Sequence, residues 1–292
     1  MMTSEHPHNP GGLPKGPDWS KLTLDETWPD RLDFSRWSGW RELFRAFTTR
    51  RRQRVQVPGS LLGRDIIPKY VLQEFHNLPN GNYSRRFSRG YITGFDVMMM
   101  GRMDRARQWI ATRLQNARAV ADVGTAGGRT AAAIKKAGVP YVCGVDPCPY
   151  LLQHAAADNP GVEFVQGVAE QLPFSNGQLD GLSLCFVLHE MPPLYIERAL
   201  KEFFRVLQPG GRVVLVEPSA AQMQMPPLKK LTGKQGWLHL YFAALARMVH
   251  EPFIPTWHKL DKRALFTGAG FIVLEEYEAM PFHCWVAQKP AK

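Results

Sequence analysis

The segment Val120-Ala121-Asp122-Val123-Gly124-Thr125-Ala126-Gly127-Gly128-Arg129-Thr130 is the strongest indicator of the fold. It reads as an apolar strand that ends in an acidic residue, Asp122, followed by a turn of small residues that opens a helix. Small residues let the backbone approach a ligand closely, and the N–H groups at a helix start face that ligand. Dinucleotide-binding proteins also use such a turn, so the segment alone does not fix the ligand. An acidic residue ahead of the glycines suits a cationic amino acid group better than a pyrophosphate.

Apolar runs and helix-like stretches alternate around this segment. The runs expected to form strands are Ala119–Val123, Tyr141–Val145, Val162–Val165, Gly181–Leu188 and Arg212–Glu217. The stretches expected to form helices are Arg129–Ala137, Tyr150–Ala157 and Leu194–Val206. This alternation predicts a mostly parallel sheet covered on both faces, with functional residues at the carboxyl ends of its strands.

The end of the chain departs from this alternation. Two apolar runs, Phe271–Met280 and His283–Gln288, are separated only by Pro281 and Phe282. No crossover helix fits in that gap, so the two runs are predicted to pair antiparallel.

Two further segments extend the ligand hypothesis. Gly144-Val145-Asp146 ends the second predicted strand, and a carboxylate there can accept hydrogen bonds from both hydroxyls of a ribose. The alternative is that Asp146 only caps the following helix. The segment Gly167-Val168-Ala169-Glu170-Gln171-Leu172-Pro173-Phe174 comes next in the chain.

Residues 119–290 resemble the class I S-adenosylmethionine (SAM)-dependent methyltransferases, and among them the small-molecule group that includes the quinone C-methyltransferases. The glycine turn, Asp146, the segment GVAEQLPF, SLCFVLHEMP and LQPGGRVVLVEP occur in the family order. The resemblance implies a doubly wound α/β fold with a mostly parallel, seven-stranded, Rossmann-like sheet and an antiparallel final strand. It also implies SAM as the cofactor.

The resemblance assigns residues to the cofactor. They are Asp122, Gly124, Ala126, Gly128, Asp146, Val168, Ala169, Cys185 and Phe186. Asp122 would hold the amino group, the glycine turn would lie beneath the methionine portion, and Asp146 would bind the ribose. Val168 and Ala169 would flank the adenine, while Cys185 and Phe186 would lie near the sulfonium. Ala126 and Val168 depart from the Gly and Asp that relatives often carry, which puts the strength of SAM binding in doubt.

A general base would assist transfer to a phenol, an enol or an acidic carbon. His189 follows the fourth predicted strand, and its ordinary pKa suits this role. A structural role for His189 is the alternative, and Glu190 and Glu217 are weaker candidates. An Asn/Asp-Pro-Pro-aromatic motif does not follow the strand, which disfavours a nucleobase nitrogen as acceptor.

The chain is predicted to have three parts. Residues 1–30 would be a flexible leader, residues 31–118 a basic, aromatic, helical cap, and residues 119–292 the SAM-binding domain with a lid insertion at about 219–260. In the cap, a short amphipathic helix is expected within 32–70 and a longer one at about Gly94–Gln115. Tyr91, placed before the longer helix, is a candidate aromatic cap over the cofactor. The apolar run Trp237–Val249 would be a lid, an interfacial helix or core packing.

Charge is concentrated in the cap. The 292-residue chain has a formal net charge of +10, and Arg41–Arg118 contains sixteen Arg and Lys against five Asp and Glu. Such a segment attracts a membrane surface, nucleic acid or an acidic substrate, unless it is only a solvated face. The four cysteines form no CxxC pair, which disfavours a zinc site. Without a secretory signal or a long apolar run, we expect a cytoplasmic protein, with peripheral membrane contact left open.

The leading hypothesis is methyl transfer, by direct in-line displacement, from SAM to a small, apolar or aromatic acceptor. An RNA-directed methyltransferase and a non-catalytic SAM-binding regulator are the alternatives, and nucleic acid is the less favoured partner. A nicotinamide dehydrogenase fits the PGG segment and the antiparallel ending poorly. The sequence leaves the oligomeric state open.

Overall fold

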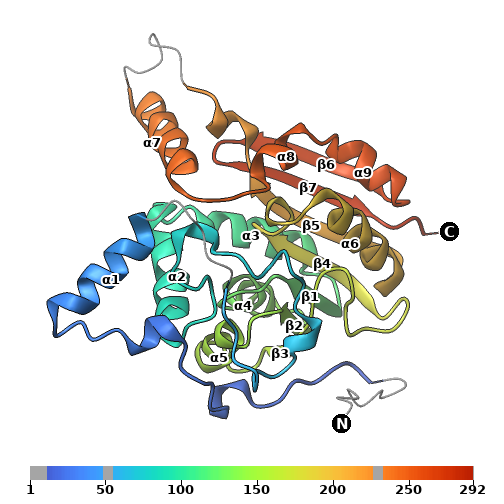
Figure 1. The fold of residues 1–292 in the computed structure, drawn as a ribbon. Coiled ribbons are helices and arrows are strands. Elements are labelled where there is room, and N and C mark those ends of the chain that lie inside the picture. The colour runs from blue at the N-terminus through green and yellow to red at the C-terminus, as the bar shows by residue number, and fades with distance from the viewer. Residues whose placement is uncertain (1–11, 49–54, 226–232, 292) are drawn as a thin grey trace.

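The computed structural model describes residues 12–48, 55–225 and 233–291. Its centre is a seven-stranded sheet with the order β3-β2-β1-β4-β5-β7-β6 (Figure 1). The strands are β1 (Ala119–Val123), β2 (Tyr141–Asp146), β3 (Glu163–Gln166), β4 (Leu179–Cys185), β5 (Leu207–Pro218), β6 (Ile272–Ala279) and β7 (Phe282–Gln288). Neighbours among β1 to β5 are parallel, and β7 runs antiparallel to both β5 and β6. The predicted α/β sheet and its reversed final strand are therefore confirmed.

Helices cover both faces of the sheet. The α-helices of the described residues are α1 (Trp37–Thr48), which stands away from the sheet (Figure 1), α2 (Arg85–Met98), α3 (Met103–Leu114), α4 (Arg129–Lys136), α5 (Pro149–Asp158), α6 (Pro193–Val206), α7 (Lys234–Met248), α8 (Ile254–Lys259) and α9 (Lys262–Gly268). Along β5, Val213 and Leu215 pack in one core with α6, α8 and α9, whereas Val214 and Val216 pack in the other with α3, α4 and α7. Burial on both faces explains why the parallel strands read as continuous apolar runs.

The single long helix expected at 94–115 is wrong. Two helices, α2 and α3, occupy this region, and Met100 and Gly101 between them have φ angles of 51° and 69°. Left-handed residues cannot continue a right-handed helix, so the chain turns there although the apolar spacing continues. Tyr91 consequently lies within α2, not before a helix.

The expected flexible leader is also corrected where it is described. Trp19 is buried, and its indole N–H donates a 2.8 Å hydrogen bond to the carbonyl of Phe164 on β3. Leu24 is buried as well. Residues 12–30 therefore pack on the domain, while residues 1–11 lie outside the described part of the chain.

The short amphipathic helix expected within 32–70 is present as α1. Trp37, Trp40 and Phe44 on this helix are 79%, 51% and 67% exposed. The arginine run 50–52 lies outside the described residues. Among the described residues, no helix is long and apolar enough to span a membrane.

The lid insertion expected at about residues 219–260 contains a 3-10 turn (Ala220–Met223), α7 and α8. Residues 226–232, which include two of the lysines ahead of α7, lie outside the described residues. Tyr241 on α7 donates a 2.7 Å hydrogen bond to the carbonyl of Met98 at the end of α2. The insertion is thus joined to the amino-terminal helices.

Two strand boundaries differ from the prediction by three residues or more. β4 ends at Cys185, three residues before the predicted end, because Phe186 has a φ of 64° and a 3-10 turn, η5 (Leu188–Glu190), follows. β5 begins at Leu207, before the predicted Arg212, because Leu207 already pairs with Leu179 of β4.

Candidate active site

A cavity lies at the carboxyl ends of β1, β2 and β4. The volume that the centre of a water molecule can occupy within it is about 160 Å³. A cavity that holds a single water needs only about 10–15 Å³ by the same measure. The chain runs from β1 outward to β2 and β3 and then returns to β4 on the other side of β1. Such a switch point is where open α/β sheets bind ligands.

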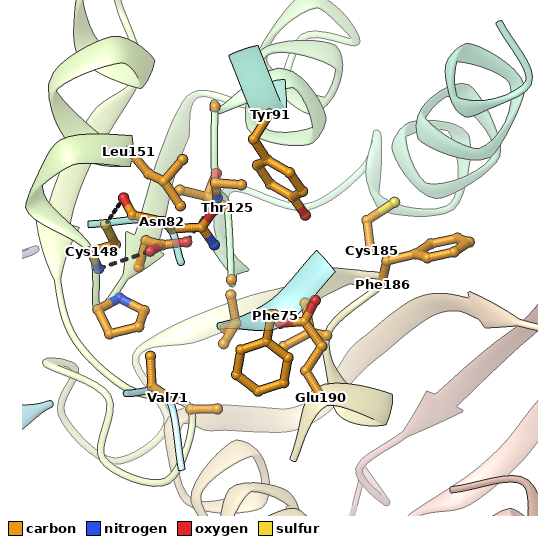
Figure 2. Close-up of a pocket in the computed structure, with 18 of the residues that line it drawn as sticks. Val71, Phe75, Asn82, Tyr91, Thr125, Cys148, Leu151, Cys185, Phe186 and Glu190 are labelled. Carbon is orange, nitrogen blue, oxygen red and sulfur yellow. Dashed lines mark hydrogen bonds between the residues drawn. The ribbon is translucent and has the colours of Figure 1, made fainter. Parts of the chain in front are cut away.

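Most of the predicted cofactor residues meet at this cavity. Those that line it are Tyr91, Gly124, Ala126, Asp146, Val168, Ala169, Cys185 and Phe186. Asp122, Gly128 and His189 are not among the lining residues. Figure 2 shows Tyr91, Cys185 and Phe186 around the space, with Leu151 and Cys148 on the opposite side.

Asp146 is fixed at the end of β2 by two backbone donors. Its Oδ2 accepts the N–H of Ala126 and its Oδ1 accepts the N–H of Cys148, both at 2.9 Å. Burial raises the pKa of Asp146 to about 7, although these two hydrogen bonds lower it. Each carboxylate oxygen has lone-pair capacity left for another donor. A buried carboxylate with this spare capacity fits a vicinal diol such as a ribose.

The turn after β1 is left-handed at three positions. Gly124, Ala126 and Gly128 have φ angles of 68°, 46° and 73°. A Cβ on Gly128 would lie 2.7 Å from Cζ of Phe164, so only glycine fits there without displacement. Ala126 adopts the left-handed conformation with its methyl group in place, at a cost of about 1 kcal/mol. The departure from glycine at Ala126 therefore leaves the shape of the turn intact.

Asp122 on β1 accepts hydrogen bonds from the turn, from α4 and from β4. Its Oδ2 accepts the Thr125 hydroxyl at 2.6 Å, and its Oδ1 accepts the Ser183 hydroxyl at 2.7 Å. Oδ2 also accepts the N–H of Ala131 at 3.2 Å. Burial raises the pKa of Asp122 to about 6, against these hydrogen bonds. The structure thus places Asp122 beside the turn, where both of its oxygens accept hydrogen bonds from the chain.

His189 lies behind the cavity wall. Its Nδ1 is 2.6 Å from Oε2 of Glu217, whose other oxygen accepts the N–H groups of Val187 and Leu188. Burial lowers the pKa of His189, but Glu217 outweighs that effect and the pKa rises to about 9. Glu190, its neighbour in sequence, does line the cavity.

Two other histidines near the end of the chain are not among the residues that line the cavity. His283 pairs with Glu276 at 3.2 Å across β6 and β7. The backbone carbonyl of His250 accepts the N–H of His76 at 3.0 Å.

Sequence reasoning missed one wall of the cavity. It comes from the loop before α2 and includes Tyr70, Phe75, Asn82 and Tyr83. The Oδ1 of Asn82 and the hydroxyl of Tyr83 are buried, and neither has a hydrogen-bond partner in the described part of the chain. Buried polar atoms are normally satisfied, so these two orphaned groups fit a polar ligand in the cavity. The loop has no periodic pattern that would have revealed it.

Comparison with known proteins identifies the central part of the chain. Residues 121–215, which contain the glycine turn, Asp146 and Val168, match the family model described as methyltransferase domain. The chain carries a methyltransferase domain. The resemblance to this family that the sequence motifs indicated is thereby confirmed.

The methyltransferase domain has named relatives. An uncharacterized methyltransferase of Synechocystis sp. is 36% identical over 98 residues, which is 34% of this chain and 46% of the relative. A demethylmenaquinone methyltransferase of Chlorobaculum parvum is 35% identical over 112 residues, 38% of this chain and 45% of the relative. A ubiquinone/menaquinone biosynthesis C-methyltransferase of Bartonella bacilliformis is 44% identical over 72 residues, 25% of this chain and 26% of the relative. The matches thus span less than half the length of each relative.

Proposed function

We propose that this protein transfers a methyl group from SAM to a small, apolar or aromatic acceptor by direct in-line displacement. The cavity at the switch point of a methyltransferase domain, with the Asp146 carboxylate held at its edge, is the observation that carries the proposal. When bound, SAM supplies an electrophilic methyl group on a positively charged sulfur. Binding, orientation and exclusion of water are what this chain adds.

The residues present fit such a cofactor. Asp146 would accept the ribose hydroxyls, and Val168 and Ala169 would pack against the adenine. The backbone of the turn at Gly124 and Ala126 would lie beneath the methionine portion. The unpartnered Asn82 and Tyr83 atoms would supply polar contacts that neither the sequence nor the resemblance had indicated.

The acceptor side of the cavity is aromatic. The rings of Phe95 and Phe186 meet edge to face, with centroids 5.5 Å apart. The rings of Phe95 and Tyr91 are tilted, with centroids 6.0 Å apart. Aromatic rings in tilted and edge-to-face contact offer faces and edges against which a further flat ring can pack. The names of two relatives, a demethylmenaquinone methyltransferase and a ubiquinone/menaquinone biosynthesis C-methyltransferase, support a quinone-type ring as that acceptor.

The proposal is tested by following the tritium of methyl-labelled SAM into organic-extractable product with demethylmenaquinol as acceptor. We expect label in the product with the wild-type protein and none with Asp146→Ala. Label in RNA that disappears after nuclease treatment would favour the RNA-directed alternative. SAM binding without transfer to a broad acceptor panel would favour the non-catalytic regulator.

A further inference from the structure

Five ionisable side chains meet beside the cavity from separate parts of the chain. They are His76 from the loop before α2, His189 and Glu190 from η5, Glu217 from β5, and Glu251 from the segment before α8. Nε2 of His76 lies 3.1 Å from Glu190 and 3.5 Å from Glu251. Nδ1 of His189 lies 2.6 Å from Glu217, and its Nε2 lies 3.9 Å from Glu251. These contacts join all five groups into one cluster, called here the imidazole–carboxylate cluster.

The glutamates of the imidazole–carboxylate cluster control the protonation of its two histidines. Burial lowers the pKa of His76, but Glu190 and Glu251 outweigh it and raise the pKa to about 10. The pKa of His189 is raised to about 9. Burial raises the pKa of Glu251, but the hydrogen bond and the charges of the histidines lower it overall. Both imidazole rings are therefore protonated at neutral pH, and they face the side chains of Glu190, Glu217 and Glu251.

Glu190 is the member of the cluster that lines the cavity. Figure 2 shows its carboxylate and the Tyr91 hydroxyl pointing toward one another across the space. The His76 ring contacts both residues: it lies 3.1 Å from Glu190 and is stacked on the ring of Tyr91, with centroids 5.1 Å apart and planes 21° apart. His76 is therefore positioned to hold Glu190 without reaching the cavity itself.

The backbone that carries His76 is strained and held in place. His76 and Asn77 have φ angles of 55° and 59°. The N–H of His76 donates to the carbonyl of His250 at 3.0 Å, and the side-chain amide of Asn77 donates to the carbonyl of Met248 at 2.8 Å. Left-handed side-chain-bearing residues persist where the surrounding structure fixes them, and they concentrate at functional sites. The contacts with 248–251 fix the imidazole of His76 against Glu190.

We propose that Glu190 takes up the proton that the methyl acceptor loses, and that His76 is the residue that positions Glu190 for this. The proposal rests on the proposed methyl transfer. The acceptor's electron pair forms the new bond to the methyl carbon, and the electrons of the broken C–S bond stay on sulfur. The acceptor's proton forms an O–H bond with Glu190, and the electrons of the bond that held this proton stay on the acceptor.

The electrostatic surroundings of Glu190 include groups from every neighbouring segment. They are His76, Glu251, His189, Asp146, Tyr70 and Tyr91. His76 and His189 supply the positive charge, and Asp146 and Glu251 the competing negative charge. A pH profile of Glu190→Gln must therefore be compared with that of Glu251→Gln, which removes a carboxylate of the same cluster that does not line the cavity.

The experiment uses the full chain and four variants. They are Glu190→Gln, His76→Asn, Glu251→Gln and the control Glu197→Gln, an exposed carboxylate on α6. Among residues with a side chain, asparagine is one of those that best tolerate the left-handed backbone at position 76. Three quantities are measured for each protein: the affinity for S-adenosylhomocysteine (SAH) by calorimetry, the titration of the histidine rings by NMR, and methyl transfer to demethylmenaquinol from pH 6 to 10.

We expect Glu190→Gln to bind SAH within about threefold of wild type, to lower the pH at which His76 titrates, and to lose about 10²–10⁴-fold in kcat. His76→Asn is expected to lower kcat, with little change in KM, and to alter the shape of the pH profile. Glu251→Gln is expected to retain much more activity than Glu190→Gln, and Glu197→Gln to match wild type.

Two results would overturn the proposal. Glu190→Gln could keep kcat within threefold of wild type, or His76 could titrate identically in both proteins. Failure of wild type to bind SAH, or binding of SAH without methylation of demethylmenaquinol, would instead count against the proposed function on which the proposal rests.

Discussion

The carboxylate of Asp146 and the backbone N–H of Ala126 are joined by a 2.9 Å hydrogen bond that ties the end of β2 to the turn after β1. The bond forms because Ala126 takes a left-handed conformation, with φ 46°. The hydrogen bond holds the carboxylate at the edge of the cavity. The same contact therefore shapes the turn and orients the side chain that is predicted to bind the ribose. Ala126, which departs from the family's glycine, thus takes part in the site through its backbone.

Cofactor affinity is expected to fall in mildly acidic solution. Because the pKa of Asp146 is raised to about 7, the carboxylate that would accept the ribose hydroxyls becomes protonated as the pH drops through neutrality. We expect SAH affinity to decrease about tenfold between pH 8 and pH 6, in proportion to the ionised fraction. Calorimetry at both pH values measures this. Asp146→Asn should bind weakly at both, and an unchanged pH dependence in that variant would assign the effect to another group.

The pair of His189 and Glu217 is expected to stabilise the fold. Glu217→Gln removes the charge that faces a buried imidazolium at 2.6 Å, and breaking such a pair costs about 3 kcal/mol. Because the pKa of His189 is raised in the folded protein, this stabilisation is complete below its unfolded pKa of about 6.5 and disappears as the pH rises through about 9.

Urea denaturation at pH 7 and pH 10 measures this contribution. The difference between wild type and Glu217→Gln should be large at pH 7 and smaller at pH 10, with Glu197→Gln as the control for an exposed carboxylate. An equal difference at the two pH values would show that the backbone contacts of Glu217, and not the ion pair, are responsible.

The close approach at Gly128 gives a third prediction. Gly128→Ala places a methyl group 2.7 Å from Phe164 and 2.9 Å from the Asn159 amide, on a backbone with φ 73°. Gly138→Ala is the matched control, because its φ is also positive, at 98°, and its Cβ would meet no atom within 4 Å. We expect Gly128→Ala to unfold at a lower urea concentration than the control. Its loss in the free energy of unfolding should exceed that of the control by about 1–3 kcal/mol. Equal losses of stability in the two variants would mean that the positive φ angle alone, and not the contact with Phe164, requires glycine at position 128.

The sequence predicted the parts of the fold that local patterns specify. The apolar runs gave the parallel strands, and the short gap at Pro281 and Phe282 gave the antiparallel ending. The glycine turn and Asp146 located the cavity, because the carboxyl ends of adjacent parallel strands converge in space.

The parts that were missed depend on contacts between distant segments. The loop carrying Asn82 and Tyr83 has no periodicity, and it becomes a cavity wall only by packing on the sheet. His76 meets Glu190 and Glu251 through tertiary structure, so their spacing in sequence carries no signal. The break at Met100 follows from two left-handed residues that leave the apolar spacing unchanged. The membrane contact considered for the basic, aromatic segment stays a prediction. Trp37 and Trp40 in this segment are exposed.

Calorimetric titration of the full chain with SAH examines the cofactor site without knowledge of the acceptor. Wild type is expected to bind one equivalent, and Asp146→Ala to bind at least about tenfold more weakly, because removal of the carboxylate leaves the ribose hydroxyls without their acceptor. Gly138→Ala, which alters a residue away from the cavity lining, should bind as wild type does. Absence of detectable binding of both SAM and SAH to the folded wild-type protein would contradict the assignment of this cavity to the methyl donor.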